Sequence, residues 1–238
     1  MAITIKSERE IELMAEAGKI LERVHNELEK ALRPGMSTKD IDTLGEEIIR
    51  SYGCIPSFLN YNGYPASICV SVNQEVVHGI PDKHRIIQEG DIVSLDAGVI
   101  YKGYHSDAAR THAVGEASEE AKKLIQVTKE CFFEGIKFAK AGNHLFDISG
   151  AIGRYAEERG YGVVRDLCGH GIGTALHEAP EIPNYEVGRK GVRLRPGMTL
   201  AIEPMINIGT YEVDWLDDDW TVVTRDGSLS AHYENTIL

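Results

Sequence analysis

The feature that most constrains the fold is an internal repeat with a constant offset of 107 residues. It relates glycines that follow helical segments, an Asp-Ile pair near the start of two helices, and a strand that ends in a carboxylate. The matched positions are Gly35 and Gly142, Asp40-Ile41 and Asp147-Ile148, Gly53 and Gly160, Gly90 and Gly197, and Asp96 and Glu203. Such a register across two helices and a strand is not expected by chance. We therefore predict two similar α/β halves, about 1–115 and 116–238, related by a pseudo-twofold axis within one domain.

Helices in both halves are predicted from apolar residues spaced three or four positions apart. The first begins with the capping box Ser7-x-x-Glu10 and stops at Pro34-Gly35. The second is expected to be capped by Thr38. The predicted helices cover about 7–33, 38–52, 118–140 and 145–159, and short strands are expected near 67–72 and 76–78.

A β-hairpin is predicted over 92–100 and 103–112, with its turn at Tyr101-Lys102. This turn would place Asp96 directly opposite Asp107, with Cβ atoms roughly 5 Å apart. Two carboxylates at that distance repel, so the pair needs a cation or a shared proton. The alternative is that both aspartates lie on a face exposed to solvent.

Further candidate ligands lie in the second half. His170 stands among three glycines in Cys168–Gly173, a run that matches neither the dinucleotide fingerprint nor the phosphate-binding P-loop. Glu203 lies in an otherwise apolar strand, where a charge without a partner would be costly to bury. Glu234 stands close to the C-terminus, and a surface position stays open for it.

These side chains form a ligand set of carboxylates and imidazole without a thiolate, which suits divalent Mn, Fe, Co or Zn. Four carboxylates are balanced by two divalent ions, and a two-metal site activates water and polarises a carbonyl. His78 and His177 are left as proton donors or oxyanion partners. The ligand set consists of Asp96, Asp107, His170, Glu203 and Glu234.

The formal net charge of −12 argues against nucleic acid as a partner, although local ribosome contact through small basic clusters stays open. None of the 4 cysteines forms a Cys-x-x-Cys pair, which suits a reducing cytosol. The N-terminus lacks the apolar region of a signal peptide, and no apolar run approaches the ~20 residues that span a membrane. We expect a cytoplasmic protein without membrane contact.

Several motifs form a specific set. They are Asn-Gly-Tyr-Pro (62–65), Val-Asn-Gln-Glu-Val-Val-His-Gly-Ile-Pro (72–81), Asp-Ala-Gly…His-Ser-Asp-Ala-Ala-Arg-Thr (96–111), Gly-His-Gly-Ile-Gly (169–173) with His177-Glu178, Ile-Glu-Pro-Met (202–205) and Ser-Ala-His-Tyr-Glu-Asn-Thr (230–236). Together they resemble the family of type I methionine aminopeptidases in its bacterial form, and the resemblance covers nearly the whole chain. It implies the duplicated pita-bread fold, an antiparallel sheet covered by helices. It also implies a monomer that removes the initiator methionine of nascent proteins when the second residue is small.

The resemblance also implies a role for each site residue. Asp96 would chelate one metal, Asp107 and Glu234 would bridge, and His170 and Glu203 would complete the second site. Glu203 would also accept the proton of the attacking water, His78 would bond near the scissile amide, and His177 would stabilise the tetrahedral intermediate. The methionine side chain would fill a pocket formed by Tyr61, Tyr64, Cys69 and Trp220.

The sequence departs from the family pattern in a few places. Leu176 and Phe58 replace residues common at the pocket rim, and the acidic run 217–219 precedes Trp220. Because the chain ends at Leu238, we expect the edge that holds Glu234 to fray. Two rival functions are an X-Pro peptidase, whose known forms usually carry an additional N-terminal domain, and a binding module on the same fold.

Overall fold

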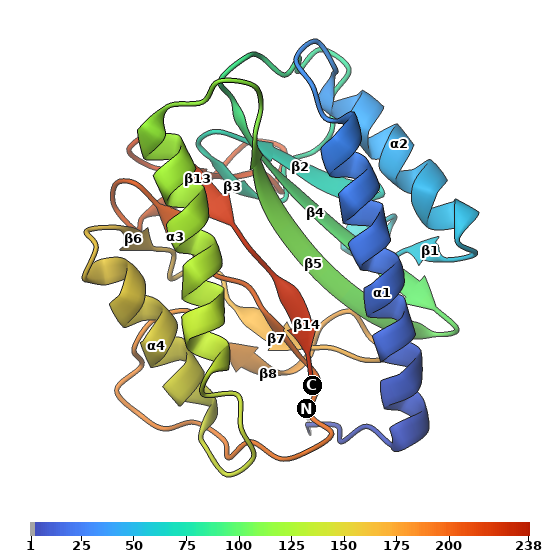
Figure 1. The fold of residues 1–238 in the computed structure, drawn as a ribbon, viewed down its shortest axis with the longest axis vertical. Coiled ribbons are helices and arrows are strands. Elements are labelled where there is room, and N and C mark those ends of the chain that lie inside the picture. The colour runs from blue at the N-terminus through green and yellow to red at the C-terminus, as the bar shows by residue number, and fades with distance from the viewer. Residues whose placement is uncertain (1–2) are drawn as a thin grey trace.

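The computed structural model describes residues 3–238, and within this range four helices lie on one side of a layer of antiparallel strands (Figure 1). The helices are α1 (Glu8–Ala31), α2 (Thr38–Ser51), α3 (Glu119–Ile136) and α4 (Leu145–Glu157). The strands are β1 (Ile55–Pro56), β2 (Ile68–Val72), β3 (Glu75–Val77), β4 (Ile92–Tyr101), β5 (Tyr104–Ala113), β6 (Gly162–Val163), β7 (Gly169–Gly171), β8 (Glu178–Ile182), β9 (Leu200–Ile202), β10 (Met205–Asn207), β11 (Val213–Trp215), β12 (Val222–Thr224), β13 (Ser230–His232) and β14 (Asn235–Ile237).

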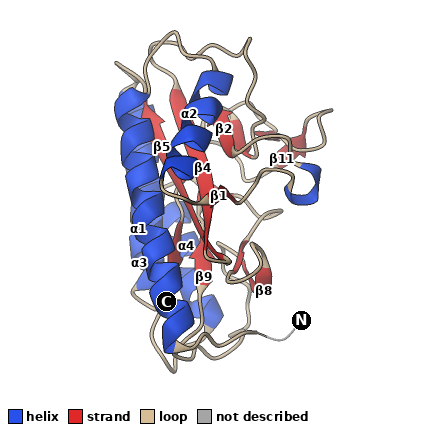
Figure 2. Ribbon diagram, turned by 90° about the vertical axis from the view of Figure 1, so that its right-hand side faces the viewer, coloured by secondary structure: helices blue, strands red, loops and turns tan. Residues whose placement is uncertain are grey.

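The strands form four antiparallel groups within the described chain. In the first half β4 pairs with β1, β2 and β5, and in the second half β9 pairs with β7 and β14. In the view turned by 90°, α1 and α3 lie at the left, β4 and β5 lie next to them, and β8 and β11 lie at the right, on the opposite side (Figure 2). None of the helices within residues 3–238 is long and apolar enough to cross a bilayer.

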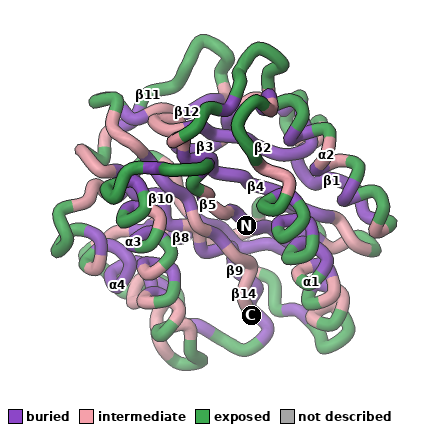
Figure 3. Tube along the Cα trace, turned by 45° about the horizontal axis from the view of Figure 1, so that its top comes forward, coloured by how far each residue is buried: buried purple, intermediate pink, exposed green. Residues whose placement is uncertain are grey.

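Each half has a core between its helices and its strands. In the first half Leu21 of α1 and Ile49 of α2 pack in one cluster with Leu95 of β4. In the second half Ile148 of α4 packs in a cluster with Ile202 of β9. Burial of each such side chain is worth about 1.5–3 kcal/mol, so the helices hold the central strands in place. The buried strands at the centre of the molecule are visible in Figure 3.

The duplication is visible in individual hydrogen bonds. The backbone N–H of Gly35 donates to the carbonyl of Ile87 at 2.9 Å, and that of Gly142 donates to the carbonyl of Leu194 at 3.0 Å. The two donors differ by 107 residues in sequence, and so do the two acceptors. The same offset relates the β-bridges Ser37↔Ile86 and His144↔Arg193, and the positive-φ glycines Gly53 and Gly160, and Gly90 and Gly197. The predicted duplicated α/β fold is therefore confirmed.

The turn of the β4–β5 hairpin lies one residue later than predicted, at Lys102-Gly103. These residues have φ values of 50° and 88°. A two-residue type I′ turn requires positive φ at both positions, and glycine adopts it without strain. The apolar pattern predicted both strands, but the glycine at the second turn position determines where the chain reverses.

The later turn changes the register of the hairpin. Asp96 lies opposite Ala109, and Asp107 lies opposite Gly98. The prediction that Asp96 faces Asp107 directly is therefore wrong. Because the pairing shifts by two positions and the side-chain period of a strand is two, both aspartates still lie on one face, as diagonal neighbours.

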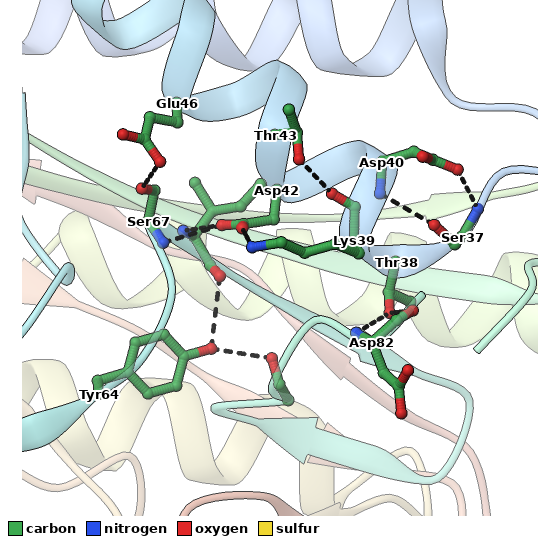
Figure 4. Close-up of polar contacts among 12 residues, drawn as sticks. Ser37, Thr38, Lys39, Asp40, Asp42, Thr43, Glu46, Tyr64, Ser67 and Asp82 are labelled. Carbon is green, nitrogen blue, oxygen red and sulfur yellow. Dashed lines mark hydrogen bonds and ion pairs between the residues drawn. The ribbon is translucent and has the colours of Figure 1, made fainter. Parts of the chain in front are cut away.

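Helix ends differ from the predictions by a few residues. The N-cap of α2 is Ser37, not Thr38: the Ser37 hydroxyl accepts from the Asp40 amide, and the Asp40 carboxylate accepts from the Ser37 amide (Figure 4). Thr38 instead bonds the backbone of Asp82. The predicted capping box of α1, formed by Ser7 and Glu10, is confirmed.

The C-terminal segment forms backbone hydrogen bonds with strands of both halves. β14 pairs with β9, and the backbone of Glu234 exchanges two hydrogen bonds with Ala109 of β5, at 2.9 and 3.3 Å. The segment that was expected to fray is thus tied to β9 and to β5, and these bonds hold Glu234 in place.

Candidate metal centre

Four carboxylates from both halves line one cavity. Asp96 lies on β4, Asp107 lies on β5, Glu203 follows β9, and Glu234 precedes β14. Asp96, Asp107 and Glu234 are 9%, 4% and 2% exposed, and the Glu203 side chain is 13% exposed. The alternatives in which the aspartates or Glu234 face solvent are therefore excluded.

The two glutamates face each other across their strands. β9 and β14 pair Ile202 with Asn235. The next position along the pairing is occupied by Glu203 and Glu234. The second half therefore has carboxylates in direct register, whereas the first half has them on a diagonal.

His170 completes the group from the neighbouring strand β7. Its Nδ1 donates to the carbonyl of Gly171 at 2.9 Å, which leaves the lone pair of Nε2 free. Nε2 lies 3.4 Å from Oε1 of Glu203 and 4.0 Å from Oδ2 of Asp107. One ligand atom each from Asp107, His170 and Glu234 lies within 4.8 Å of the other two.

Burial and mutual repulsion oppose ionisation of the four carboxyl groups. Burial raises the pKa of Asp96 to about 7. Burial, and then the charge of Asp96, raises the pKa of Asp107 well above its ordinary value. Burial, and then the charge of Asp107, also raise the pKa values of Glu203 and Glu234 well above the ordinary value. Burial also lowers the pKa of His170 to about 3, so its imidazole is neutral and able to bind a metal.

The donor atoms fit a divalent cation. Among residues 3–238, Oδ1 of Asp96, Oδ1 of Asp107 and Oε1 of Glu234 are buried without a hydrogen-bond partner. An unpaired buried polar atom costs about 1–3 kcal/mol, and more when it is charged. Carboxylate oxygens with one neutral imidazole form a set that Mn, Fe, Co and Zn all accept. A cation would satisfy the orphaned oxygens and relieve the repulsion among the carboxylates.

The cavity beside the carboxylates has a volume of about 120 Å³. All of the side chains predicted as site residues line it, and Phe58, Asn62 and Leu176 line it as well. The predicted residues are Tyr61, Tyr64, Cys69, His78, Asp96, Asp107, His170, His177, Glu203, Trp220 and Glu234. The structure thus brings together every residue of the predicted site.

The apolar part of the cavity is held by buried polar contacts behind it (Figure 4). The Tyr64 hydroxyl is 2.9 Å from the carbonyl of Gly79, to which it donates. The carboxylate of Asp42 accepts from the backbone N–H groups of Ser67 and Ile68, at 2.8 and 3.1 Å. These bonds fix the start of β2, so the next residue, Cys69, faces the cavity.

The acidic run before Trp220 is a structured turn. Oδ1 of Asp218 accepts from the backbone N–H groups of Trp220 and Thr221, at 2.9 and 2.7 Å. The Trp220 ring lies edge-on to Tyr64, with ring centres 5.1 Å apart. Asp218 therefore holds one wall of the cavity.

Two further histidines, His177 and His78, line the cavity. Nδ1 of His177 lies 2.9 Å from the Tyr61 hydroxyl. The His177 ring packs edge-on against the His170 ring, with ring centres 4.2 Å apart. His78 has a φ of 60°, a left-handed conformation that is uncommon outside glycine. Burial lowers the pKa of His78 to about 4, so its ring is neutral at pH 7.

His232 was not singled out by the sequence. It is 2% exposed, and its Nε2 lies 4.0 Å from Oε2 of Glu203 and 4.0 Å from Oε2 of Glu234. Its spacing of two residues from Glu234 is the pattern that would have shown it, because alternate residues of an extended chain face the same side.

Comparison with known proteins agrees with this arrangement. The model of metallopeptidase family M24 matches residues 12–238. A methionine aminopeptidase of Clostridium acetobutylicum is 59% identical over 235 residues, which are 99% of this chain and 94% of the relative. The crystal structure of methionine aminopeptidase from Thermotoga maritima matches with a TM-score of 0.97 and 48% identity. The match covers 100% of this chain and 95% of the Thermotoga chain.

More distant members of the fold have other names. The Xaa-Pro dipeptidase of Bacillus anthracis has a TM-score of 0.78 and 29% identity over 98% of this chain, which matches 59% of the dipeptidase. The fold and the buried carboxylate and histidine cluster define a metallopeptidase of the pita-bread class. The chain belongs to metallopeptidase family M24. Among its relatives, those named methionine aminopeptidase match it almost from end to end.

Proposed function

We propose that the chain removes the N-terminal methionine from nascent polypeptides when the second residue is small. The main observation behind the proposal is that a single cavity has a charged part and an apolar part next to each other. Buried carboxylates and His170 line one part, and aromatic side chains with the thiol of Cys69 line the other. The first suits hydrolysis of a peptide bond, and the second suits an unbranched thioether side chain.

Two divalent ions, Co, Mn, Fe or Zn, are the proposed cofactors, because two charges of +2 balance four carboxylates. Asp96 would hold one ion, Asp107 and Glu234 would be shared, and His170 and Glu203 would complete the second site. When bound, such ions activate a water molecule and polarise the scissile carbonyl. The orphaned oxygens of Asp96, Asp107 and Glu234, defined above within residues 3–238, support this assignment.

Proton transfer is assigned to residues of the chain. Glu203 accepts the proton of the attacking water, because its carboxylate lines the cavity beside His170 and the other carboxylates. His177, held by Tyr61, stabilises the tetrahedral intermediate by hydrogen bonding. His78, in its left-handed conformation, hydrogen-bonds near the scissile amide.

Specificity is assigned to the apolar wall. Tyr61, Tyr64, Cys69 and Trp220 would surround the methionine side chain. Leu176 lies in the same buried cluster and lines the cavity. A leucine at this position leaves more room than an aromatic ring and sets the shape of the rim.

The setting of the enzyme follows from its substrate. We place residues 1–238 in one catalytic domain that acts as a monomer in the cytoplasm, where nascent chains emerge. Within the described chain Cys54, Cys69, Cys131 and Cys168 are free thiols, as a reducing compartment allows. Contact with the ribosome would be local and transient, since the net charge of −12 disfavours broad binding to RNA.

Release of methionine from a Met-Gly-x peptide with added Co²⁺ or Mn²⁺ tests the proposal. An Ala-Pro peptide tests the X-Pro alternative in the same assay. Replacing Glu203 by Gln should reduce kcat by roughly 10²–10⁴-fold, because the proton acceptor is lost. The matched control is Glu157→Gln on an exposed part of α4, which should keep full activity. Cleavage of Ala-Pro in place of Met-Gly-x, or full activity of the Glu203 variant, would contradict the proposal.

A further inference from the structure

A buried ion pair lies behind the loop that carries His177. Nζ of Lys6 is 2.7 Å from Oε2 of Glu178, and the two side chains are only 5% and 12% exposed. The hydroxyl of Thr4 also donates to Oε2 of Glu178, at 2.5 Å. The N-terminal segment before α1 is thereby attached to the first residue of β8, directly after His177.

Glu178 also closes its own loop. Its Oε1 accepts from the backbone N–H of Ala175 at 3.3 Å. The carbonyl of Gly173 accepts from the backbone N–H of His105 on β5 at 2.8 Å. A Cβ atom at Gly173 would lie 2.4 Å from Oε1 of Glu178 and 2.6 Å from Cε of Lys6, so these groups fill the space behind the loop.

The other end of this attachment leads to the metal centre. The backbone N–H of Lys6 donates to the carbonyl of Gly197 at 2.7 Å. Gly197 stands just before β9, the strand that leads to Glu203. Lys6 therefore connects the loop of His177 with the strand of Glu203, two residues that line the same cavity.

Stability alone gives little reason for such a pair, because a buried ion pair is often no more stabilising than apolar residues of similar size. Its geometry is restrictive, however: both charges must stay together, since a lone buried charge is costly. Burial opposes ionisation of Glu178, but hydrogen bonds from Lys6 and Thr4 keep its pKa below the ordinary value.

We infer that Lys6 and Glu178 are positioning residues that hold the 173–178 loop, and with it the His177 ring, against the cavity. The inference rests on the proposed function of His177 and extends the working site to the N-terminal segment. Neither residue contacts the reacting atoms; each acts through the loop.

Three variants test the inference: Lys6→Met, Glu178→Gln and the double variant. Lys6→Met leaves a buried carboxylate without its partner, and roughly a 10- to 100-fold loss of kcat on Met-Ala-Ser is expected from displacement of His177. Glu178→Gln leaves the Lys6 ammonium without a charged partner, but it keeps an oxygen that can accept from Lys6 or Ala175, so a smaller loss is expected. The double variant has no lone buried charge and should fold, but its loop is detached and its kcat should stay low. Lys122→Met, which breaks an exposed pair with Glu119 on α3, is the matched control and should change nothing.

The decisive readout is the NMR spectrum of ¹⁵N-labelled histidine side chains, recorded beside kcat, KM and the denaturant midpoint. We expect the His177 resonances to shift in Lys6→Met and in the double variant, but not in Lys122→Met. A lowered midpoint with unchanged kcat and unchanged His177 resonances in both variants would overturn the inference. If the parent enzyme released no methionine, the proposed function would fail, and the NMR comparison would still report on the position of His177.

Discussion

Single residues at the centre of the cavity carry charges that the rest of the chain does not neutralise. Nε2 of His170 lies 3.4 Å from Oε1 of Glu203, yet burial keeps that imidazole neutral by lowering its pKa. A bound divalent cation would supply the positive charge that this imidazole lacks. The same burial that opposes ionisation of the carboxyl groups would strengthen their interaction with a cation.

Tyr64 tests the support behind the aromatic wall. Its hydroxyl donates to the carbonyl of Gly79, and Tyr64→Phe leaves that buried oxygen with one partner fewer. The variant should lose about 1–1.5 kcal/mol of stability in urea unfolding, because the bond is lost while the Gly79 carbonyl keeps its bond from the Val70 N–H. Because the ring is kept, KM for a Met-Ala peptide should change less than about threefold.

Tyr155→Phe is the matched control, since the Tyr155 hydroxyl bonds Glu130 near the surface of α3 and α4. It should lose less than about 1 kcal/mol. Equal losses in the two variants would show that the Tyr64 bond has no special role in holding the wall.

At the residue scale most of the site could be predicted from the sequence. A charge in an apolar strand, such as Glu203, indicates a ligand by itself, and the family motifs supplied the remaining roles. His232 was missed, because a single histidine in a short strand resembles an ordinary core residue and its spacing of two residues from Glu234 was the one signal in the sequence. Only the fold shows that it lies between two glutamates.

At the scale of elements, the duplicated glycine turns hold the helices against the strands. Gly35 and Gly142 have φ values of 89° and 97°, which favour glycine strongly. Replacement of either by Ala should cost about 1–2 kcal/mol from backbone strain, and the two losses should be similar because the turns are equivalent.

Gly18 provides the control of opposite sign. It lies inside α1, and an added Cβ would meet only the Ser106 hydroxyl, at 3.6 Å. Gly18→Ala should therefore stabilise by about 0.5–1 kcal/mol through helix propensity. Thermal unfolding of the three variants checks these signs, and a stabilised Gly35 variant would refute the role given to its turn.

Strand existence was easier to predict than strand register. The apolar alternation marked β4 and β5, but it gives the same pattern for registers that differ by two residues. The choice between them depends on the turn, where Lys102 adopts a positive φ. A lysine in the sequence does not indicate such a conformation. Helix ends were misplaced for a related reason, because Ser37 and Thr38 are both good capping residues and only the contacts of Thr38 with Asp82 distinguish them.

At the scale of the whole molecule, buried neutral groups make stability depend on pH. His25 of α1 is buried, its Nε2 donates to the carbonyl of Ala108 at 2.8 Å, and burial lowers its pKa to about 3. In the unfolded chain a histidine has a pKa of about 6.5. The unfolded state therefore binds the proton first, so this stability is fully present above about pH 6.5 and is lost as the pH falls toward 3.

His25→Gln removes this titration. Between pH 6.5 and 4 the stability of the parent should fall more steeply than that of the variant, by about 1.4 kcal/mol per pH unit. Urea unfolding at several pH values measures the difference, and His84→Gln, on an exposed residue, should follow the parent. Parallel curves for the parent and the His25 variant would contradict the account.

The duplication explains why the centre lies where it does. Corresponding strands of the two halves supply Asp96 and Glu203, and neighbouring strands add Asp107 and Glu234. The repeat in the sequence predicted this meeting of carboxylates. The strands of the second half have only two to five residues, and a pattern that short could not be recognised in the sequence.

The central claim is that two divalent ions held by these carboxylates drive removal of methionine. Titration of the metal-free enzyme with Mn²⁺ or Co²⁺, with methionine release from a Met-Ala peptide followed at each step, tests it most directly. We expect activity to rise from zero and to level off by two equivalents, with release by the Glu203→Gln variant slower by roughly 10²–10⁴-fold at every metal level. Full activity of the metal-free enzyme in the presence of chelator would contradict the claim.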